Sequence, residues 1–288
     1  MRILVLGGDG MLGHEVLRSL SGGHEIRVTL RQPIDAYTAF NLFSEQNAID
    51  RVDARDARRV DQVVRSFAPD AVVNCVGIVK QRHEAKAAIP SLEINSLLPH
   101  RLLETCAAIG ARLIHFSTDC VFSGRGSAYQ ERDEPDPLDL YGRTKLLGEI
   151  EDAPGLTLRS SIIGLELSRK TGLIEWFLAQ RGTLRGFQRA IYTGLTTIEM
   201  ARLVRRLVER HAGLHGVWHV ASAPISKYDL LVRLSDKLER SDVMIVPDVE
   251  FVCDRSLDGA RFTAATGYAP PSWDDMLTEL AADIRHRR

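Results

Sequence analysis

The sequence predicts an α/β fold, in which a doubly wound parallel sheet carries helices on both faces. Apolar, strand-like runs alternate with helical patterns, and no internal repeat of solenoid length interrupts them. The runs at 71–76 and 111–116 are nearly continuous in apolar residues, as expected of parallel strands that are buried on both faces. A glycine-rich turn joins the first apolar run to the first helical stretch. This order of elements is typical of a Rossmann-type fold.

Composition indicates a folded chain with a buried core and no strongly charged partner. Of the 288 residues 44% are apolar, and 37 basic side chains nearly balance 38 acidic ones. Nucleic-acid and membrane-surface binders usually show a basic excess, which this chain lacks. Four dispersed cysteines fit reduced thiols better than disulfides or a zinc site. No apolar run has the length of a signal peptide or a membrane span, so we expect a cytoplasmic protein without nucleic-acid or membrane partners.

The opening stretch predicts a dinucleotide-binding unit of strand, turn and helix. A short apolar run ends at Gly7, and Gly10 and Gly13 follow at three-residue steps before a helical pattern begins. Gly7 permits the tight turn, Gly10 lets the backbone approach a pyrophosphate, and Gly13 lets helix and strand pack closely. Free N–H groups at the start of the helix, around Met11 and Leu12, would face the phosphates.

The end of the second strand bears on the choice of dinucleotide. Residues 24–30 alternate and are rich in β-branched side chains, which predicts a strand. Arg31 follows, with no carboxylate before Asp35, whereas proteins that prefer NAD usually have an acid at this position. An arginine suits the 2′-phosphate of NADPH, so we expect NADPH as the cofactor, with NADH as the alternative. The plain alternative is that Arg31 only solvates the strand end.

The remaining elements continue this alternation as far as Gly164. We expect a loop with a short strand over 40–56, a helix over 60–67, a strand over 71–76, a helix over 92–109, a strand over 111–116, a loop over 123–139, a helix over 140–150 and a strand over 156–163. Beyond Gly164 we expect helices over 173–180, 198–210, 226–238 and 273–284, strands over 217–220 and 244–247, and an irregular polar stretch over 182–195. The chain is therefore divided into a dinucleotide-binding domain, 1–164, and a C-terminal substrate-binding α/β lobe, 165–288, which is intertwined with the first part and not independent.

Thr118, Tyr141 and Lys145 form the candidate catalytic group. Thr118 follows a strand whose end should face the nicotinamide, and Tyr141 and Lys145 lie four residues apart on one face of a helix start. Reduction of a ketone needs a hydride on carbon and a proton on oxygen. We expect the lysine ammonium to lower the tyrosine pKa toward neutral, so that Tyr141 acts as the acid. Lys145 can also bind the nicotinamide ribose, and Thr118 can hydrogen-bond the carbonyl oxygen.

Several motifs resemble those of one enzyme family. They are GGDGMLG at 7–13, STDCVFSG at 117–124 and YGRTKLLGE at 141–149, with weaker echoes in NCVG at 74–77, WHVASAPISKYDLL at 218–231 and ATGYAPPSW at 265–273. The chain thereby resembles an extended short-chain dehydrogenase/reductase, most closely the dTDP-4-dehydrorhamnose reductase-like family of nucleotide-sugar 4-ketoreductases. The resemblance implies reduction of the 4-keto group of a nucleotide-linked 6-deoxy sugar, and we expect the product to enter the biosynthesis of a surface polysaccharide or a glycosylated metabolite.

The resemblance assigns further residues to the site. It gives the catalytic roles to Thr118, Tyr141 and Lys145. It places Asp53 and Ala54 by the adenine ring and Val76 and Gly77 along the cofactor. The sequence departs from the family at Cys120, where a tyrosine is common, and at NCVG, where the usual form is alanine-rich.

Substrate contacts are expected from two parts of the chain. Asp119 lies beside Thr118, and Arg185, Arg189 and Tyr192 fall in the C-terminal segment where a sugar diphosphate should lie. Asn95 is either a support near Lys145 or a plain polar helix residue. The nine histidines show neither HxH nor HExxH spacing, so no metal is expected.

Two other functions stay open at this point. One is an epimerase or dehydratase on the same scaffold, although a dehydratase normally needs a carboxylate pair beside the threonine and this chain has Cys120 after Asp119. The other is a non-catalytic, NADP-binding regulatory subunit, which has no reason to keep the three catalytic residues together. A homodimer is also left open.

Overall fold

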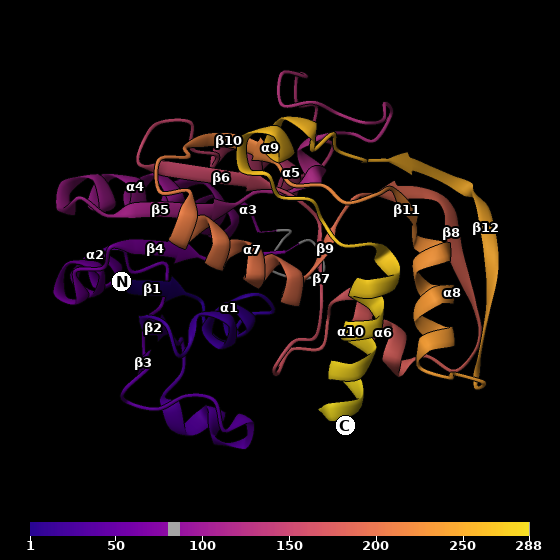
Figure 1. The fold of residues 1–288 in the computed structure, drawn as a ribbon, viewed down its shortest axis with the longest axis horizontal. Coiled ribbons are helices and arrows are strands. Elements are labelled where there is room, and N and C mark those ends of the chain that lie inside the picture. The colour runs from indigo at the N-terminus through magenta and orange to yellow at the C-terminus, as the bar shows by residue number, and fades with distance from the viewer. Residues whose placement is uncertain (80–86, 288) are drawn as a thin grey trace.

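The computed structural model describes residues 1–79 and 87–287. Its centre is a parallel sheet of seven strands in the order β10-β6-β5-β4-β1-β2-β3, which confirms the predicted fold class (Figure 1). The strands are β1 (Arg2–Leu6), β2 (Glu25–Thr29), β3 (Ala48–Ile49), β4 (Ala71–Asn74), β5 (Arg112–Phe116), β6 (Gly155–Arg159) and β10 (Gly216–His219).

Helices cover both faces of this sheet, and the apolar side chains of β1 divide between two cores. Ile3 and Val5 pack on the side of α1 (Gly13–Leu20) and α7 (Thr197–Arg210). Leu4 and Leu6 pack on the side of α2 (Ala57–Phe67) and α4 (Leu98–Ile109). Successive strand side chains point to opposite faces, so burial on both sides explains the continuous apolar run.

The C-terminal segment contributes to the central sheet itself. β10 pairs with β6 as the edge strand, and α7 packs against α1. Both elements lie beyond residue 164, in the part of the chain that is predicted to form the C-terminal lobe. The boundary at 164/165 stays a prediction.

A smaller sheet corrects the prediction for residues 182–195. They are not irregular, because 182–192 form β8 (Gly182–Tyr192), which pairs in parallel with β12 (Val243–Asp254) and antiparallel with β11 (Ile225–Ser226). Gly186 obscures the alternation of the sequence because it packs closely against Tyr228 of α8 (Lys227–Lys237), where a Cβ would lie 3.0 Å from atoms of that tyrosine. The strand expected at 244–247 is correspondingly much longer.

Three other boundaries differ from expectation. The strand over 156–163 breaks after Arg159, and β7 (Ile162–Ile163) pairs instead with β9 (Leu195–Thr196). The helix over 92–109 begins as a π-helical stretch, η3 (Leu92–Leu97), before α4. α5 (Leu140–Leu147) ends at Gly148, where a Cβ would overlap the Asn95 carbonyl oxygen.

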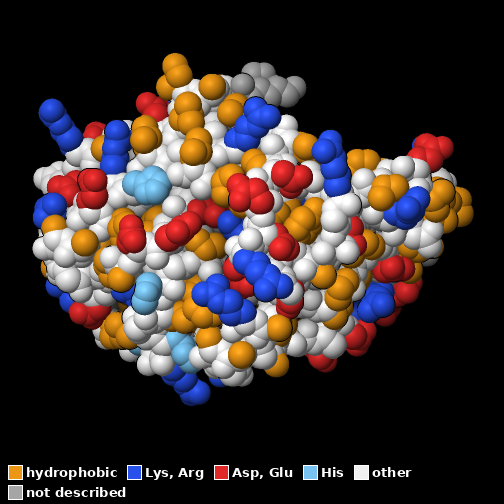
Figure 2. All heavy atoms as spheres, turned by 90° about the horizontal axis from the view of Figure 1, so that it is seen from above, with side chains coloured by type: hydrophobic (Ala, Val, Ile, Leu, Met, Phe, Trp, Pro, Cys, Tyr) orange, Lys and Arg blue, Asp and Glu red, His pale blue; other side chains and the backbone are white. Residues whose placement is uncertain are grey.

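Five short helical elements and the C-terminal helix complete the described chain: η1 (Ile34–Phe40), α3 (Ala88–Ser91), η4 (Asp119–Val121), α6 (Leu173–Ala179), α9 (Ala260–Thr266) and the longer α10 (Trp273–His286). Within residues 1–79 and 87–287 no helix is long and apolar enough to cross a membrane. The face shown in Figure 2 intersperses acidic and basic side chains without an extended area of one sign.

Candidate active site

A cavity of about 600 Å³ lies at the carboxyl ends of β1, β4 and β5. This edge of a doubly wound sheet is where ligands normally bind. The cavity brings together most of the residues expected for the cofactor and all three of those expected for catalysis: Gly10, Met11, Leu12, Val76, Gly77, Thr118, Asp119, Tyr141, Lys145 and Tyr192.

The glycine turn has the geometry of a phosphate cradle. Gly7 has φ +80°, which favours glycine. A Cβ at Gly13 would overlap the Gly7 carbonyl oxygen, and one at Gly10 would lie 3.1 Å from the same atom. No side chain caps the start of α1, where Leu12 is the N-cap, so the first N–H groups of the helix can receive an anion.

Tyr141 and Lys145 are positioned by a capped helix start. The Asp139 carboxylate accepts the Gly142 N–H at 2.8 Å as the N-cap of α5. Lys145 is buried, and its Nζ donates to the Phe116 carbonyl oxygen at 2.5 Å. The helix thus places the amine directly at the end of β5.

His115 is a further neighbour of Lys145 that sequence reasoning missed. Its Nε2 lies 3.3 Å from Lys145 Nζ, and its Nδ1 lies 3.1 Å from Asn74 Nδ2. The Asn74 Oδ1 accepts the Val76 N–H at 3.2 Å, which orients the amide so that Nδ2 donates to the imidazole. This pattern assigns the proton of neutral His115 to Nε2, facing the amine. His115 lies between apolar residues in β5, so its polar side chain is the only feature of the sequence that indicates a role in the site.

Burial shifts the pKa values of this pair downward. It lowers the pKa of Lys145 to about 8, against a smaller opposing effect of the Glu149 carboxylate. It also holds the pKa of His115 well below its usual range, with the Lys145 charge adding to the effect. Lys145 therefore changes charge close to neutral pH.

The expected lowering of the Tyr141 pKa is wrong for this structure. Burial raises the pKa of the phenol well above its ordinary value, and the hydrogen bond with Thr118 lowers it only in part. The Lys145 amine contacts the Phe116 carbonyl and His115 instead, which explains why it does not lower the pKa of Tyr141 as expected. Tyr141 consequently stays a protonated phenol at neutral pH.

Thr118 and Asp119 belong to one hydrogen-bonded turn. The Thr118 hydroxyl accepts the Cys120 N–H at 3.1 Å and donates to Asp119 Oδ1 at 3.2 Å. Asp119 Oδ2 accepts a hydrogen bond of 2.5 Å from the Ser161 hydroxyl. The turn fixes both side chains at the end of β5, beside Tyr141.

The two arginines expected at the substrate are not brought to the cavity. Arg185 and Arg189 lie exposed on β8, and Arg185 forms an ion pair with Asp248 at 3.2 Å. Lys227 and Arg255 line the cavity instead. Arg255 donates from Nε to the Phe122 carbonyl at 2.9 Å and reaches Cys120 Sγ at 3.3 Å. Sequence reasoning missed Arg255 because it follows β12, which was predicted to end much earlier.

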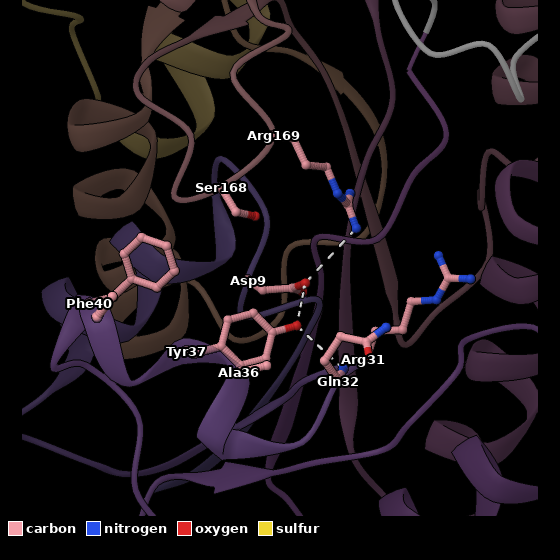
Figure 3. Close-up of a pocket in the computed structure, with 9 residues that line it drawn as sticks. Asp9, Arg31, Gln32, Ala36, Tyr37, Phe40, Ser168 and Arg169 are labelled. Carbon is pink, nitrogen blue, oxygen red and sulfur yellow. Dashed lines mark hydrogen bonds and ion pairs between the residues drawn. The ribbon is translucent and has the colours of Figure 1, made fainter.

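The residues expected at the adenosine end lie beside this cavity. Arg31 Nε is 3.8 Å from Asp53 Oδ2, and Asp53 also accepts a 2.6 Å hydrogen bond from Arg55. That bond is the main reason why the pKa of Asp53 is held at about 2. Ala54 is partly buried against the core beneath α2. Arg31 lines a second cavity of about 360 Å³, which Figure 3 shows.

Asn95 has a structural position. Its Oδ1 accepts the Ile78 N–H and its Nδ2 donates to the Ile78 carbonyl and to the Thr144 hydroxyl. It thereby ties the end of β4 to α5. Among the described residues, no group of histidine, cysteine, aspartate or glutamate side chains could hold a metal ion.

The family model described as RmlD substrate binding domain matches residues 1–154, just over half of the 288 residues. The chain belongs to this family. This match covers the glycine turn, Thr118, Tyr141 and Lys145, which the structure gathers around one cavity.

Three known proteins illustrate the relationship. The dTDP-4-keto-6-deoxy-D-glucose reductase of Streptomyces niveus is 29% identical over 84% of this chain and 80% of its own. Methionine adenosyltransferase 2 subunit beta of Rattus norvegicus is 26% identical over 82% of this chain and 71% of its own. The crystal structure of dTDP-4-dehydrorhamnose reductase from Bacillus anthracis, in complex with NADP, superposes with a TM-score of 0.80. That comparison covers 98% of this chain and 99% of the other at 19% identity, which shows the shared fold.

Proposed function

We propose that this chain is an NADPH-dependent reductase of the 4-keto group of a nucleotide-linked 4-keto-6-deoxy sugar. The observation that carries the proposal is the convergence of Thr118, Tyr141 and Lys145 on a cavity that the glycine turn also lines. A hydroxyl, a phenol and an amine beside a dinucleotide cradle are the groups that carbonyl reduction requires. The reductase name of the Streptomyces niveus relative supports the same reaction class.

The residues present fit a dinucleotide. Gly7 and Gly13 allow the turn to pack tightly, and Gly10 lines the cavity beside the uncapped start of α1, where a pyrophosphate would lie. Val76 and Gly77 line the cavity along the end of β4. Arg31 favours the 2′-phosphate of NADPH, and the NADP bound to the Bacillus anthracis protein of the same fold agrees with it. NADPH, when bound, supplies the hydride.

The chain's own residues supply the proton and hold the carbonyl. Tyr141 remains protonated in its buried position and donates its phenolic proton to the developing alkoxide. The Thr118 hydroxyl, which donates to Asp119 Oδ1 in this structure, would turn its proton toward the same oxygen when the substrate is bound. Lys145, as the ammonium, stabilises the phenolate that remains on Tyr141.

The substrate diphosphate requires cationic partners inside the cavity. Arg255 and Lys227 meet this requirement, because both line the same cavity as Tyr141. Asp119 and Tyr192 line the same space and would contact the sugar. Arg185 and Arg189 would need to reach the ligand from the outer face of β8.

The test follows NADPH consumption with a panel of nucleotide-linked 4-keto-6-deoxy sugars. We expect turnover with at least one sugar, and a roughly 100- to 10,000-fold loss of kcat in Tyr141→Phe because the proton donor is removed. NADPH affinity should change little in this variant. Tyr228→Phe, on α8 and outside the cavity lining, serves as the matched control. Full activity of Tyr141→Phe would contradict the assigned role.

A regulatory subunit is the second candidate, because a similar chain is named as subunit beta of methionine adenosyltransferase 2. On that alternative the chain would bind NADPH and oxidise none of it with any sugar in the panel. An epimerase or dehydratase would convert the sugar without net consumption of NADPH. NADPH consumption therefore identifies a reductase, and NMR analysis of the recovered sugar separates an epimerase or dehydratase from a regulatory subunit.

A further inference from the structure

The second cavity lies between the end of β2 and a segment from the C-terminal part of the chain. Asp9 of the glycine turn, Arg31 and Gln32 form one side, and Ser168 and Arg169 form the other. Figure 3 shows the guanidinium of Arg169 directed at the Asp9 carboxylate, while the Arg31 side chain extends away from this pair, toward the right of the view. Arg31 and Arg169, which are 138 positions apart in the sequence, thus line the same small cavity.

The segment 166–172, which we call the crossing segment, lies over the glycine turn. It is closed on Glu166, whose carboxylate accepts the Gly172 N–H at 2.9 Å and also the Thr171 N–H. A Cβ at Gly172 would lie 3.9 Å from Met11 Sδ, which places the segment against the turn. Glu166, Thr171 and Gly172 line the larger cavity, whereas Ser168 and Arg169 line the smaller one. A dinucleotide extending between the cavities would pass between the turn and this segment.

The donors of both arginines are uncommitted among the residues that the structure describes. Arg169 Nη2 is 3.9 Å from Asp9 Oδ2, and Arg31 Nε is 3.8 Å from Asp53 Oδ2, distances too long for hydrogen bonds. Asp9 already accepts the Tyr37 hydroxyl at 2.9 Å. Around this cavity Arg31, Arg55 and Arg169 face the carboxylates of Asp9 and Asp53, so a net positive charge remains, which suits a phosphate dianion.

We propose that Arg169, on the crossing segment, binds the adenosine 2′-phosphate of NADPH together with Arg31. The inference rests on the proposed use of NADPH and deepens it, because it assigns cofactor selection to a residue outside the N-terminal part of the chain. Asp9 positions Arg169 through their ion contact and keeps the guanidinium over the cavity. Arginine is suited to this role because its planar fork can donate two hydrogen bonds to one phosphate.

The experiment measures calorimetric binding of two ligands that differ only in the 2′-phosphate, adenosine 2′,5′-bisphosphate and adenosine 5′-monophosphate. For Arg169→Ala we expect about ten- to hundredfold weaker binding of the bisphosphate, with the monophosphate changed less than about twofold. Arg169→Lys keeps the charge but lacks the planar guanidinium, so its affinity for the bisphosphate should lie between those of the parent protein and Arg169→Ala. Arg101→Ala, which removes an exposed arginine of α4 that lines neither cavity, is the matched control.

Two outcomes would overturn the inference. One is an unchanged affinity of Arg169→Ala for the bisphosphate, and the other is an equal loss for both ligands, which would mean that Arg169 only supports the glycine turn. Neither outcome depends on turnover. If no sugar is reduced but the 2′-phosphate preference is lost in Arg169→Ala, the inference stands while the proposed reductase function fails.

Discussion

Lys145 shows how burial and one neighbour set the behaviour of a single side chain. Its amine sits among buried groups, with the Nε2–H of His115 at 3.3 Å and the Phe116 carbonyl at 2.5 Å. The histidine N–H favours the neutral amine, and the carbonyl favours the ammonium. Glu149, which follows the end of α5, also favours the charged form. Burial outweighs both favourable contacts, so the cation is present only at neutral and lower pH.

The pH dependence of NADPH use follows from this shift. Because burial lowers the pKa of Lys145 to about 8, the ammonium is present below that pH and is lost as the pH rises through it. We expect kcat/KM for NADPH, which reports groups of the free protein, to fall above about pH 8. The Lys145→Met variant should have a low activity, and its kcat/KM should not fall further above pH 8. A profile of the parent protein that stays level to pH 10 would contradict the assignment.

At the residue scale, chemistry in contiguous motifs was predictable and partners from distant strands were not. Thr118, Tyr141 and Lys145 were found because their spacing and their side-chain types carry the signal. His115 and Arg255 were not, because each depends on which strand ends meet in space. The direction of the Tyr141 pKa was missed for a related reason, since burial is not visible in the sequence.

The glycine turn and α1 act as one unit at the scale of elements. Gly13 packs so tightly on the Gly7 carbonyl that any side chain must displace backbone atoms. We expect Gly13→Ala to lower the free energy of unfolding by about 1–3 kcal/mol and to weaken NADPH binding strongly, because the phosphate cradle is distorted. Chemical denaturation and cofactor titration measure the two effects.

Gly213 offers the matched control for that variant. Its Cβ position is open, with no atom within 4 Å and no unusual backbone angle. We expect Gly213→Ala to change stability by less than about 0.5 kcal/mol and to leave cofactor binding intact. Equal effects of the two substitutions would show that the close approach at Gly13 is not what matters.

Elements with a strong local period were predictable, and those defined by distant pairing were less so. The central strands and α7 follow from apolar runs and a helical stripe. β8 and β12 depend on each other across a wide sequence separation, and the small residue Gly186 at their contact with α8 hides the alternation. Tertiary pairing therefore overrode a weak local pattern.

At the scale of the whole molecule, a buried polar chain links the site to the C-terminal part. Arg159 of β6 and Glu149 form a two-point ion pair at 2.7 and 2.8 Å, and both side chains are nearly inaccessible. Glu149 also accepts the Ser117 hydroxyl at 2.5 Å, while Arg159 contacts His219 of β10 at 3.2 Å. These hydrogen bonds therefore connect the ends of the neighbouring strands β5, β6 and β10, close to Thr118.

Breaking this pair should be costly because it leaves one buried charge without its partner. We expect Glu149→Ala to lower the free energy of unfolding by about 3–5 kcal/mol, and the double variant Glu149→Leu with Arg159→Met to lose clearly less. Arg65→Ala removes an exposed ion pair with Asp61 and should cost less than about 1 kcal/mol. Additive losses in a double-mutant cycle would contradict a coupled pair.

The central claim is that the chain reduces a sugar carbonyl, and deuterium transfer tests it most directly. The protein is incubated with NADPH that carries deuterium on the transferable position and with a nucleotide-linked 4-keto-6-deoxy sugar, and the product is analysed by mass spectrometry and NMR. We expect one deuterium on C4 of the sugar for each NADPH oxidised, and almost none with Tyr141→Phe. A sugar that is recovered unchanged, or converted without deuterium at C4, would contradict the account.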